Sequence, residues 1–239
     1  MPKYAIPDPQ TLSHEIQASH ERCRRFGVDP SATRNPRQKK LSQEELNNRL
    51  AQNRDFLDIA IAQIEELYQF VAGAGFAVNM ADREGYILHI IGDSPILGKL
   101  AAGNCCPGYR WTEKDVGTSV ISLALEREIP VQINDDEHFC RRGFGHTCSA
   151  SPVFGPDDQL IGVIAMSGHA SQVHPHTLGM VITAARAIEN QLRIQKASKE
   201  LLLRNNYMQA VFRCTDRVLL ALDKNGIIKQ INNQGQRIL

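Results

Sequence analysis

The 239-residue sequence lacks any apolar run long enough to cross a membrane, for which about 18 to 20 residues are needed. Its first ten residues, MPKYAIPDPQ, lack the apolar core of a secretory signal peptide. The two signs of charge nearly balance, because the chain has 27 Lys and Arg and 26 Asp and Glu side chains, which gives a formal net charge of +1. Nucleic-acid-binding domains show a basic face or stripe, which this balance gives no reason to expect. The sequence therefore predicts a cytoplasmic protein without direct binding to membrane or nucleic acid.

The motifs of common enzyme classes are also absent. The sequence holds no G-x-S-x-G elbow, Walker A loop, H-E-x-x-H or G-x-G-x-x-G. It holds no C-x-x-C pair either, so the commonest signatures of zinc-ribbon and thioredoxin-like proteins are absent. Carboxylates occur in turns, where solvated acids are usual, and no set has catalytic spacing. We therefore expect that the chain is not an enzyme.

Cysteine and histidine are well represented by contrast. The stretch EHFCRRGFGHTC contains two H-x-C pairs within eleven residues. In an extended strand a one-residue gap places both side chains on one face, and imidazole and thiolate suit zinc, copper or iron. The alternative is that these cysteines act as small apolar core residues, as free cysteines commonly do. The metal-ligand candidates are His138, Cys140, His146 and Cys148.

Two adjacent cysteines, Cys105 and Cys106, form a second unusual feature. Neighbouring cysteines rarely form a disulfide with each other, because the required geometry strains the peptide between them. Packing in a loop, metal ligation with the H-x-C cysteines and redox sensing all stay open for this pair.

Hydrophobic periodicity predicts alternating helices and strand pairs. Apolar residues three and four apart predict a helix over 12–26. The S-Q-E-E capping box at Ser42 begins a second helix, with one apolar stripe from Leu46 to Val71. Strands follow at 77–80, 86–91 and 129–133, with short helices at 95–100 and after D-V-G-T-S, where Asp115 or Thr118 would be the N-cap.

The C-terminal half contains the clearest local signals. F-G-P-D-D-Q separates two β-rich runs and predicts a hairpin. A long helix should begin at Pro175 and reach the neighbourhood of Met208. A last strand, D-K-N-G turn and strand precede the start of a helix. Adjacent strands joined by tight turns predict an α+β fold, with an antiparallel sheet and helices packed on it.

The block DVGTSVISLALEREIPVQINDDEHFCRRGFGHTCSASPVFGPDDQLIGVIAMSG, residues 115–168, resembles the GAF domain of bacterial enhancer-binding transcription activators. The matching elements are the G-T-S helix entry, the A-L-x-x-x-x-P-V bridge, the E-H-F-C loop and the C-S-A-x-P strand with its hairpin into G-V-I-A. More narrowly it is similar to regulators of acetoin catabolism and of dihydroxyacetone or glycerol use, which act with the sigma-N form of RNA polymerase. SHERCRRFGVDP resembles the helix preceding that GAF domain, and VLLALDKNGIIKQINNQGQRIL the opening of a PAS domain.

This resemblance implies a GAF-like antiparallel sheet with flanking long helices. It implies an N-terminal helical arm and linker over 1–45, a GAF domain over 46–195, a helical linker over 196–211 and the truncated start of a PAS domain over 212–239. Members of the group also carry an AAA+ ATPase and a DNA-binding helix-turn-helix, and this sequence shows neither. We expect the sensory region of such an activator, or a free-standing relative.

In GAF domains a small ligand sits between the sheet and the loops over one face, here 104–119 and 134–147. Trp111 would supply an apolar wall, and Thr118, Ser119 and His138 would hydrogen-bond a hydroxylated or carbonyl ligand. Each also has a structural alternative, such as a core position for Trp111 and a cap for Thr118. The resemblance gives as ligand-binding candidates Trp111, Thr118, Ser119, His138, Phe139, Cys140, Cys148 and Met166.

The sequence thus predicts a regulatory region that senses a small-molecule effector and relays binding through its flanking helices to a downstream AAA+ ATPase. The same helices would form a homodimer. No organic cofactor is expected. A metal or redox sensor built on the Cys/His cluster, a protein-interaction module without ligand and a small Cys-dependent enzyme remain as alternatives.

Overall fold

A computed structural model describes residues 4–238. The chain divides into two compact units between Leu192 and Arg193, and each unit is described by itself. No helix among the described residues is long and apolar enough to span a membrane.

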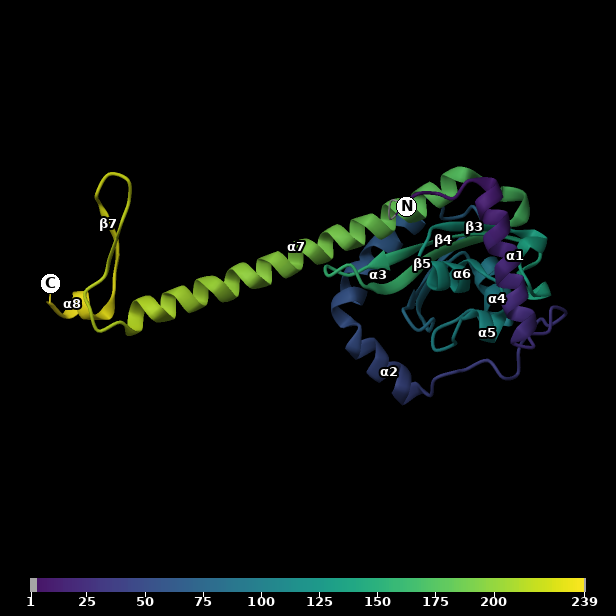
Figure 1. The fold of residues 1–239 in the computed structure, drawn as a ribbon, viewed down its shortest axis with the longest axis horizontal. Coiled ribbons are helices and arrows are strands. Elements are labelled where there is room, and N and C mark those ends of the chain that lie inside the picture. Colours follow the sequence, from purple (N-terminus) through teal and green to yellow (C-terminus); the bar gives the residue numbers. More distant parts are fainter. Residues whose placement is uncertain (1–3, 239) are drawn as a thin grey trace. The chain divides into compact units, whose positions relative to one another are not determined.

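The first unit is built on a five-stranded antiparallel sheet with strand order β2-β1-β5-β4-β3 (Figure 1). The tight turns foreseen from the sequence join β1 to β2 and β4 to β5, because their glycine and aspartate residues accept turn conformations. The fold is the predicted α+β arrangement of an antiparallel sheet with long helices. The strands are β1 (Ala77–Asp82), β2 (Ile87–Gly92), β3 (Val131–Asn134), β4 (His146–Phe154) and β5 (Leu160–His169).

Two long helices cover one face of this sheet. Helix α3 (Arg54–Gln69) and the first part of α7 (Pro175–Cys214) pack their apolar stripes against side chains of β1, β2, β4 and β5. Successive residues of a strand point to opposite faces, so Ile164 and Met166 enter this core while Val163 and Ala165 enter the other.

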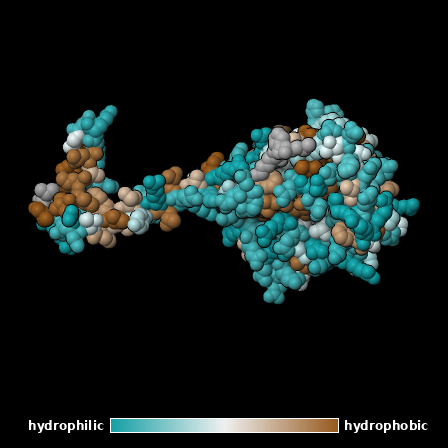
Figure 2. Space-filling view, in the orientation of Figure 1, coloured by the Kyte–Doolittle hydropathy of each residue, from teal (hydrophilic) through white to brown (hydrophobic). Residues whose placement is uncertain are grey.

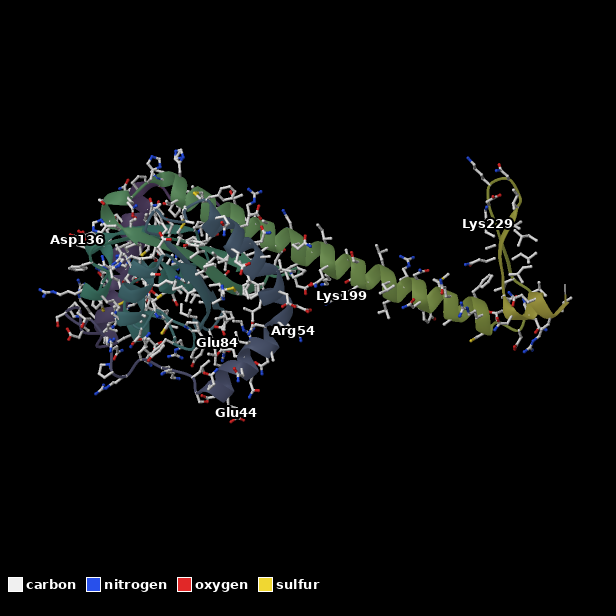
Figure 3. All side chains as sticks on the ribbon, turned by 180° about the vertical axis from the view of Figure 1, so that it is seen from behind. Glu44, Arg54, Glu84, Asp136, Lys199 and Lys229 are labelled. Carbon is white, nitrogen blue, oxygen red and sulfur yellow. The ribbon has the colours of Figure 1, made fainter. Side chains whose placement is uncertain are left out.

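Short helices and loops cover the opposite face. They are α4 (Ser94–Ala102), α5 (Glu113–Val116), α6 (Val120–Arg127) and the 3₁₀ turns η1 (Asp135–Glu137) and η2 (Arg141–Gly143). The N-terminal helix α1 (Pro9–Arg25) packs over α5, and a third turn, η3 (Ala170–Gln172), precedes α7. Charged side chains such as Glu44, Arg54, Glu84 and Asp136 project from the outer surface (Figure 3). The cover on this face is made of several short elements joined by loops, whereas two long helices cover the other face. The cavity described below lies under the short elements.

The single helix predicted from Leu46 to Val71 is wrong, because two helices occupy that range. The capping box at Ser42 is present, and it begins α2 (Gln43–Gln52). Asn53 interrupts the helix with non-helical backbone angles, and its side-chain Nδ2 donates to the carbonyl of Arg49 at 2.9 Å. Asparagine competes in this way with the helical hydrogen bonds, which explains why the apolar stripe continues while the helix does not.

The predicted N-cap of the short helix after D-V-G-T-S is also corrected. Neither Asp115 nor Thr118 caps α6; Ser119 does, and its hydroxyl accepts from the amide of Ser122 at 3.2 Å. Thr118 instead turns its hydroxyl toward α1. The long helix begins at Pro175 as predicted and ends at Cys214, beyond the expected Met208.

The second unit holds the remainder of α7, the hairpin of β6 (Leu220–Leu222) and β7 (Ile228–Ile231), and α8 (Asn233–Ile238). Figure 2 shows apolar side chains gathered on its surface. A hairpin and a short helix cannot bury their own apolar faces. That residues 212–239 form the start of a PAS domain stays a prediction. The large exposed apolar residues include Leu201, Leu202, Leu203, Tyr207, Met208, Leu222 and Ile227.

Candidate functional site

A small cavity lies in the first unit between the sheet and its cover of short elements. Its volume of about 40 Å³ is room for about three water molecules, at roughly 10–15 Å³ each. The sheet contributes three polar or thiol side chains, and the segments 100–121 and 138–146 supply the walls. These three are Asn79, Cys148 and Ser167, and His146 at the start of β4 lines the cavity as well.

Six of the eight residues expected to bind a ligand line this cavity. They come from the loop after α4, from the entry to α6, from the loop around η2 and from β4, so only the tertiary fold brings them together. Their role in ligand binding stays a prediction. The six are Trp111, Thr118, Ser119, His138, Cys140 and Cys148.

Phe139 and Met166 lie elsewhere. Phe139 packs behind the cavity wall with Cys23 and Cys140, and its ring meets the edge of His20 at 5.3 Å between centroids. Met166 enters the core under α3 and α7. The pleat of β5 explains this placement: the next residue, Ser167, lines the cavity, so Met166 must face away.

The two histidines of the cavity are held neutral by burial. Desolvation lowers the pKa of His138 to about 4, although its Nδ1 contacts the carbonyl oxygen of Asp135 at 2.9 Å. Burial also lowers the pKa of His146. At neutral pH both rings therefore act as uncharged hydrogen-bonding groups.

The buried cysteines are protonated thiols. Desolvation raises the pKa of Cys140 and of Cys148 to about 11, and it raises that of Cys105 further. Thiolate, not thiol, is the nucleophile and the metal ligand. Among residues 4–238 no group of three or more His, Cys, Asp or Glu side chains is arranged to hold a metal ion. The metal-ligand candidates, including His146, all line the cavity.

Two polar side chains in the cavity wall have buried atoms without protein partners. The Oδ1 atom of Asn79 and the Nε and Nη2 atoms of Arg142 are buried without a hydrogen bond in the described part of the chain. Buried polar groups are nearly always paired, so each such group needs an explanation. Sequence reasoning missed both residues. A polar residue inside the apolar strand A-V-N-M-A was the available signal for Asn79.

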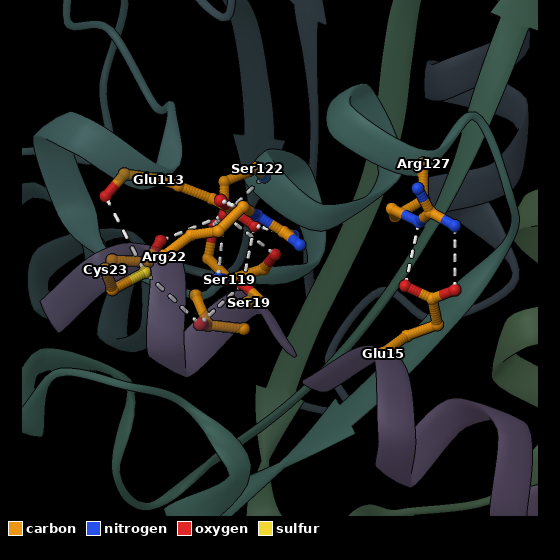
Figure 4. Close-up of polar contacts among 10 residues, drawn as sticks. Glu15, Ser19, Arg22, Cys23, Glu113, Ser119, Ser122 and Arg127 are labelled. Carbon is orange, nitrogen blue, oxygen red and sulfur yellow. Dashed lines mark hydrogen bonds and ion pairs between the residues drawn. The ribbon is translucent and has the colours of Figure 1, made fainter. Parts of the chain in front are cut away.

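A polar network joins the cavity wall to α1 (Figure 4). Thr118 lies 2.7 Å, hydroxyl to hydroxyl, from Ser19 of α1, which donates to Glu113 at 2.6 Å. Arg22 donates to both carboxylate oxygens of Glu113, from Nε at 2.7 Å and from Nη2 at 2.6 Å. A bidentate, mostly buried ion pair of this kind attracts its two partners and also fixes their relative orientation. The network thus couples the position of α1 to the entry of α6.

Acid should destabilise the first unit through His138. The unfolded ring binds a proton below about pH 6.5, whereas the folded ring binds one only below about 4. The free energy of unfolding should therefore fall as pH falls through that window, by up to about 1.4 kcal/mol per unit of pKa difference. Urea unfolding at several pH values checks this. In His138→Asn the slope below pH 6.5 should be smaller, while between pH 7 and 8 both proteins should respond alike; an unchanged acid slope would contradict the assignment.

The arrangement of sheet, covering segments and flanking helices matches known proteins. A family model described as GAF domain matches residues 55–192. The chain belongs to the GAF domain family. The family model does not extend to residues 212–239.

The relatives of this GAF chain are transcriptional regulators. A signal-transduction and transcriptional-control protein of Clostridium beijerinckii is 34% identical over 227 residues, 93% of this chain and 35% of that protein. The acetoin dehydrogenase operon transcriptional activator AcoR of Bacillus subtilis (strain 168) is 32% identical over 199 residues, 83% of this chain and 33% of that protein. This chain thus spans about a third of the length of these relatives. It corresponds to a GAF-containing third of such regulators, the family that the sequence resembled.

A solved structure has the same fold. The Escherichia coli DhaR(N)–DhaL complex matches with a TM-score of 0.87 over 94% of this chain and 76% of that chain. At 24% sequence identity this likeness shows the fold alone. It confirms the antiparallel sheet with flanking helices.

Proposed function

We propose that this region senses a small metabolite in the cavity under α5 and α6, and that it does so without catalysing a reaction. The observation that carries the proposal is the cavity itself, an apolar enclosure with a few convergent polar groups, two of which lack partners. Sites for small molecules have this composition. Protonated thiols and neutral imidazoles can serve such a site as uncharged hydrogen-bonding groups.

Binding would be relayed along two routes that start at the cavity wall. One runs from Thr118 through Ser19 to α1. The other runs through β4, where Ser149 follows the cavity residue Cys148 and lies 3.2 Å, hydroxyl to hydroxyl, from Thr177 at the start of α7. A ligand that favours one arrangement of the covering segments would bias both helices, within the limit set by its differential affinity for the two states.

The helices α3 and α7 would form the homodimer and the connection to downstream domains. A groove between them within the first unit has an apolar centre with polar side chains such as Gln63, Glu66 and Thr183 in its lining, and Phe70 there is 75% exposed. Exposed apolar patches of this kind mark protein interfaces. In the intact protein, α7 would lead through the proposed PAS domain toward an AAA+ ATPase and a DNA-binding domain. The ATPase would then activate the sigma-N form of RNA polymerase.

Ligand binding should raise the melting temperature of the chain, because a ligand that binds only the folded state stabilises it. In a screen of small diols, ketones, amines and carboxylates, a true effector at a hundredfold its Kd should raise Tm by about 5–10 °C. Ser167→Leu fills the cavity and should abolish the shift. The control Ser13→Leu, on the exposed side of α1, should keep it.

Light scattering in the presence of the effector should show a changed oligomeric state. A ligand that raises Tm equally in Ser167→Leu, or leaves the assembly unaltered, contradicts the proposed relay.

A protein-interaction module is the second candidate. Its support is the solved complex of the fold relative DhaR(N) with DhaL. The exposed apolar surface of the second unit would suit such a partner. If no small molecule shifts Tm while a partner protein binds the chain, this second function replaces the first.

A further inference from the structure

We propose that the cavity takes a small hydroxylated monocarboxylate, whose carboxylate pairs with Arg142 and whose hydroxyl pairs with Asn79. This inference deepens the proposed sensing of a metabolite and rests on it. It names the class of ligand from the two groups in the wall that the protein leaves without partners.

The guanidinium of Arg142 is half-buried, and no carboxylate of the cavity lining faces it. Its Nη1 lies 3.5 Å from the carbonyl oxygen of Gly103, a long hydrogen bond, and the thiol of Cys140 lies beside the guanidinium as a weak acceptor. Nε and Nη2 are buried and unpaired in the described part of the chain. No Asp or Glu lines the cavity. Burying a charge without a partner is costly, and a carboxylate matches the fork of an arginine.

The approach to Arg142 is also basic. Arg142 lines both the cavity and an open groove under the loop after α1, so it lies where the two meet. Six basic side chains and two acidic ones line that groove. A cleft lined mainly by one sign of charge raises the local concentration of the opposite ion. The basic residues are Arg34, Arg37, Lys39, Arg110, Lys114 and Arg142.

Asn79 selects a second group on the ligand. Its amide has an acceptor at one end and donors at the other, and a hydroxyl can both donate and accept. The side chain comes from β1, in the floor of the cavity, while Arg142 comes from the covering segment. A ligand that meets both would bridge floor and cover. The cavity volume of about 40 Å³ favours the smallest hydroxy acids, such as glycolate and lactate, over longer ones.

The test compares matched small molecules by thermal shift at constant ionic strength. Lactate carries both groups, propionate only the carboxylate and propane-1,2-diol only hydroxyls; glycolate and 3-hydroxybutyrate extend the series in size. Lactate or another hydroxy acid should raise Tm by about 5–10 °C at a hundredfold its Kd. The matched alkanoate should bind more weakly, and the diol should give no shift.

Three variants assign the groups. Arg142→Gln should weaken binding of the acids about 10- to 100-fold, the usual effect of losing a charged hydrogen bond. Without ligand it should melt no lower than the parent, because it removes a half-buried guanidinium that no carboxylate pairs with. Asn79→Ala should abolish the preference of lactate over propionate. The control Arg141→Gln, the exposed neighbour, should leave every shift unchanged.

Each other result overturns the inference in a distinct way. If diols or ketones stabilise the chain and the acids do not, the cavity senses neutral metabolites, and the proposed function survives without this ligand class. If the acids stabilise Arg142→Gln as strongly as the parent, they bind elsewhere. If none of these molecules nor any in the wider screen shifts Tm, both the inference and the proposed sensing fail.

Discussion

Replacing Glu113 by Ala should lower the free energy of unfolding by about 3 kcal/mol, because it leaves the guanidinium of Arg22 and the hydroxyl of Ser19 without their partner in a buried site. The side chain of Glu113 is only 6% exposed, so water cannot replace the lost carboxylate. Helix α1 should also detach more often, which frees the backbone of the already exposed basic linker after it for a protease. Urea unfolding measures the first effect, and the rate of tryptic cleavage at Arg34 and Arg37 measures the second.

A second ion pair on the same helix serves as the control. Glu15 of α1 pairs with Arg127, whose side chain is 45% exposed (Figure 4). Exposed pairs contribute about 0–1 kcal/mol, so Glu15→Ala should cost less than 1 kcal/mol and change cleavage little. Equal losses in the two variants would show that α1 is held by charge in general and not by the network at Glu113.

Gly117→Ala should cost about 4 kcal/mol and remove ligand binding. Gly117, at the end of α5, has φ +75° and ψ −166°, a region that only glycine occupies freely. A Cβ there would lie 2.8 Å from Cδ1 of Phe139 and 3.1 Å from Sγ of Cys140. Backbone strain and overpacking each cost about 1–3 kcal/mol. Because Cys140 lines the cavity, relief of the clash would deform the site.

Chemical unfolding and the thermal-shift series together measure this loss. The matched change Gly98→Ala lies inside α4, where a Cβ meets no atom within 4 Å, and should stabilise the chain by about 0.5–1 kcal/mol. A Gly117→Ala protein as stable as its parent would mean that the loop before α6 is free to rearrange, which contradicts a preformed cavity.

Local parts of the fold could be predicted from sequence patterns. The capping box at Ser42, the hairpin turn F-G-P-D-D-Q and the start of α7 at Pro175 are local signals, and each is present in the structure. The interruption at Asn53 was missed, because an apolar stripe keeps its period across a short break in the backbone. The cap of α6 was misassigned, because D-V-G-T-S offers several hydroxyl and carboxylate groups, and packing against α1 decides which of them is free to cap.

The sequence by itself indicated the fold class through periodicity and turn chemistry, and the block 115–168 carried the resemblance to the GAF family. The covering segments 104–119 and 134–147 that this resemblance implied are only part of the cover, because α4 and α6 lie outside them. Only the tertiary structure decided which side chains share the cavity. The pleat turned Met166 away and Ser167 inward, and the packing of α1 placed Phe139 behind the wall. Burial of a polar atom depends on neighbours distant in sequence. The unpaired groups of Asn79 and Arg142 are therefore visible only once the chain has folded.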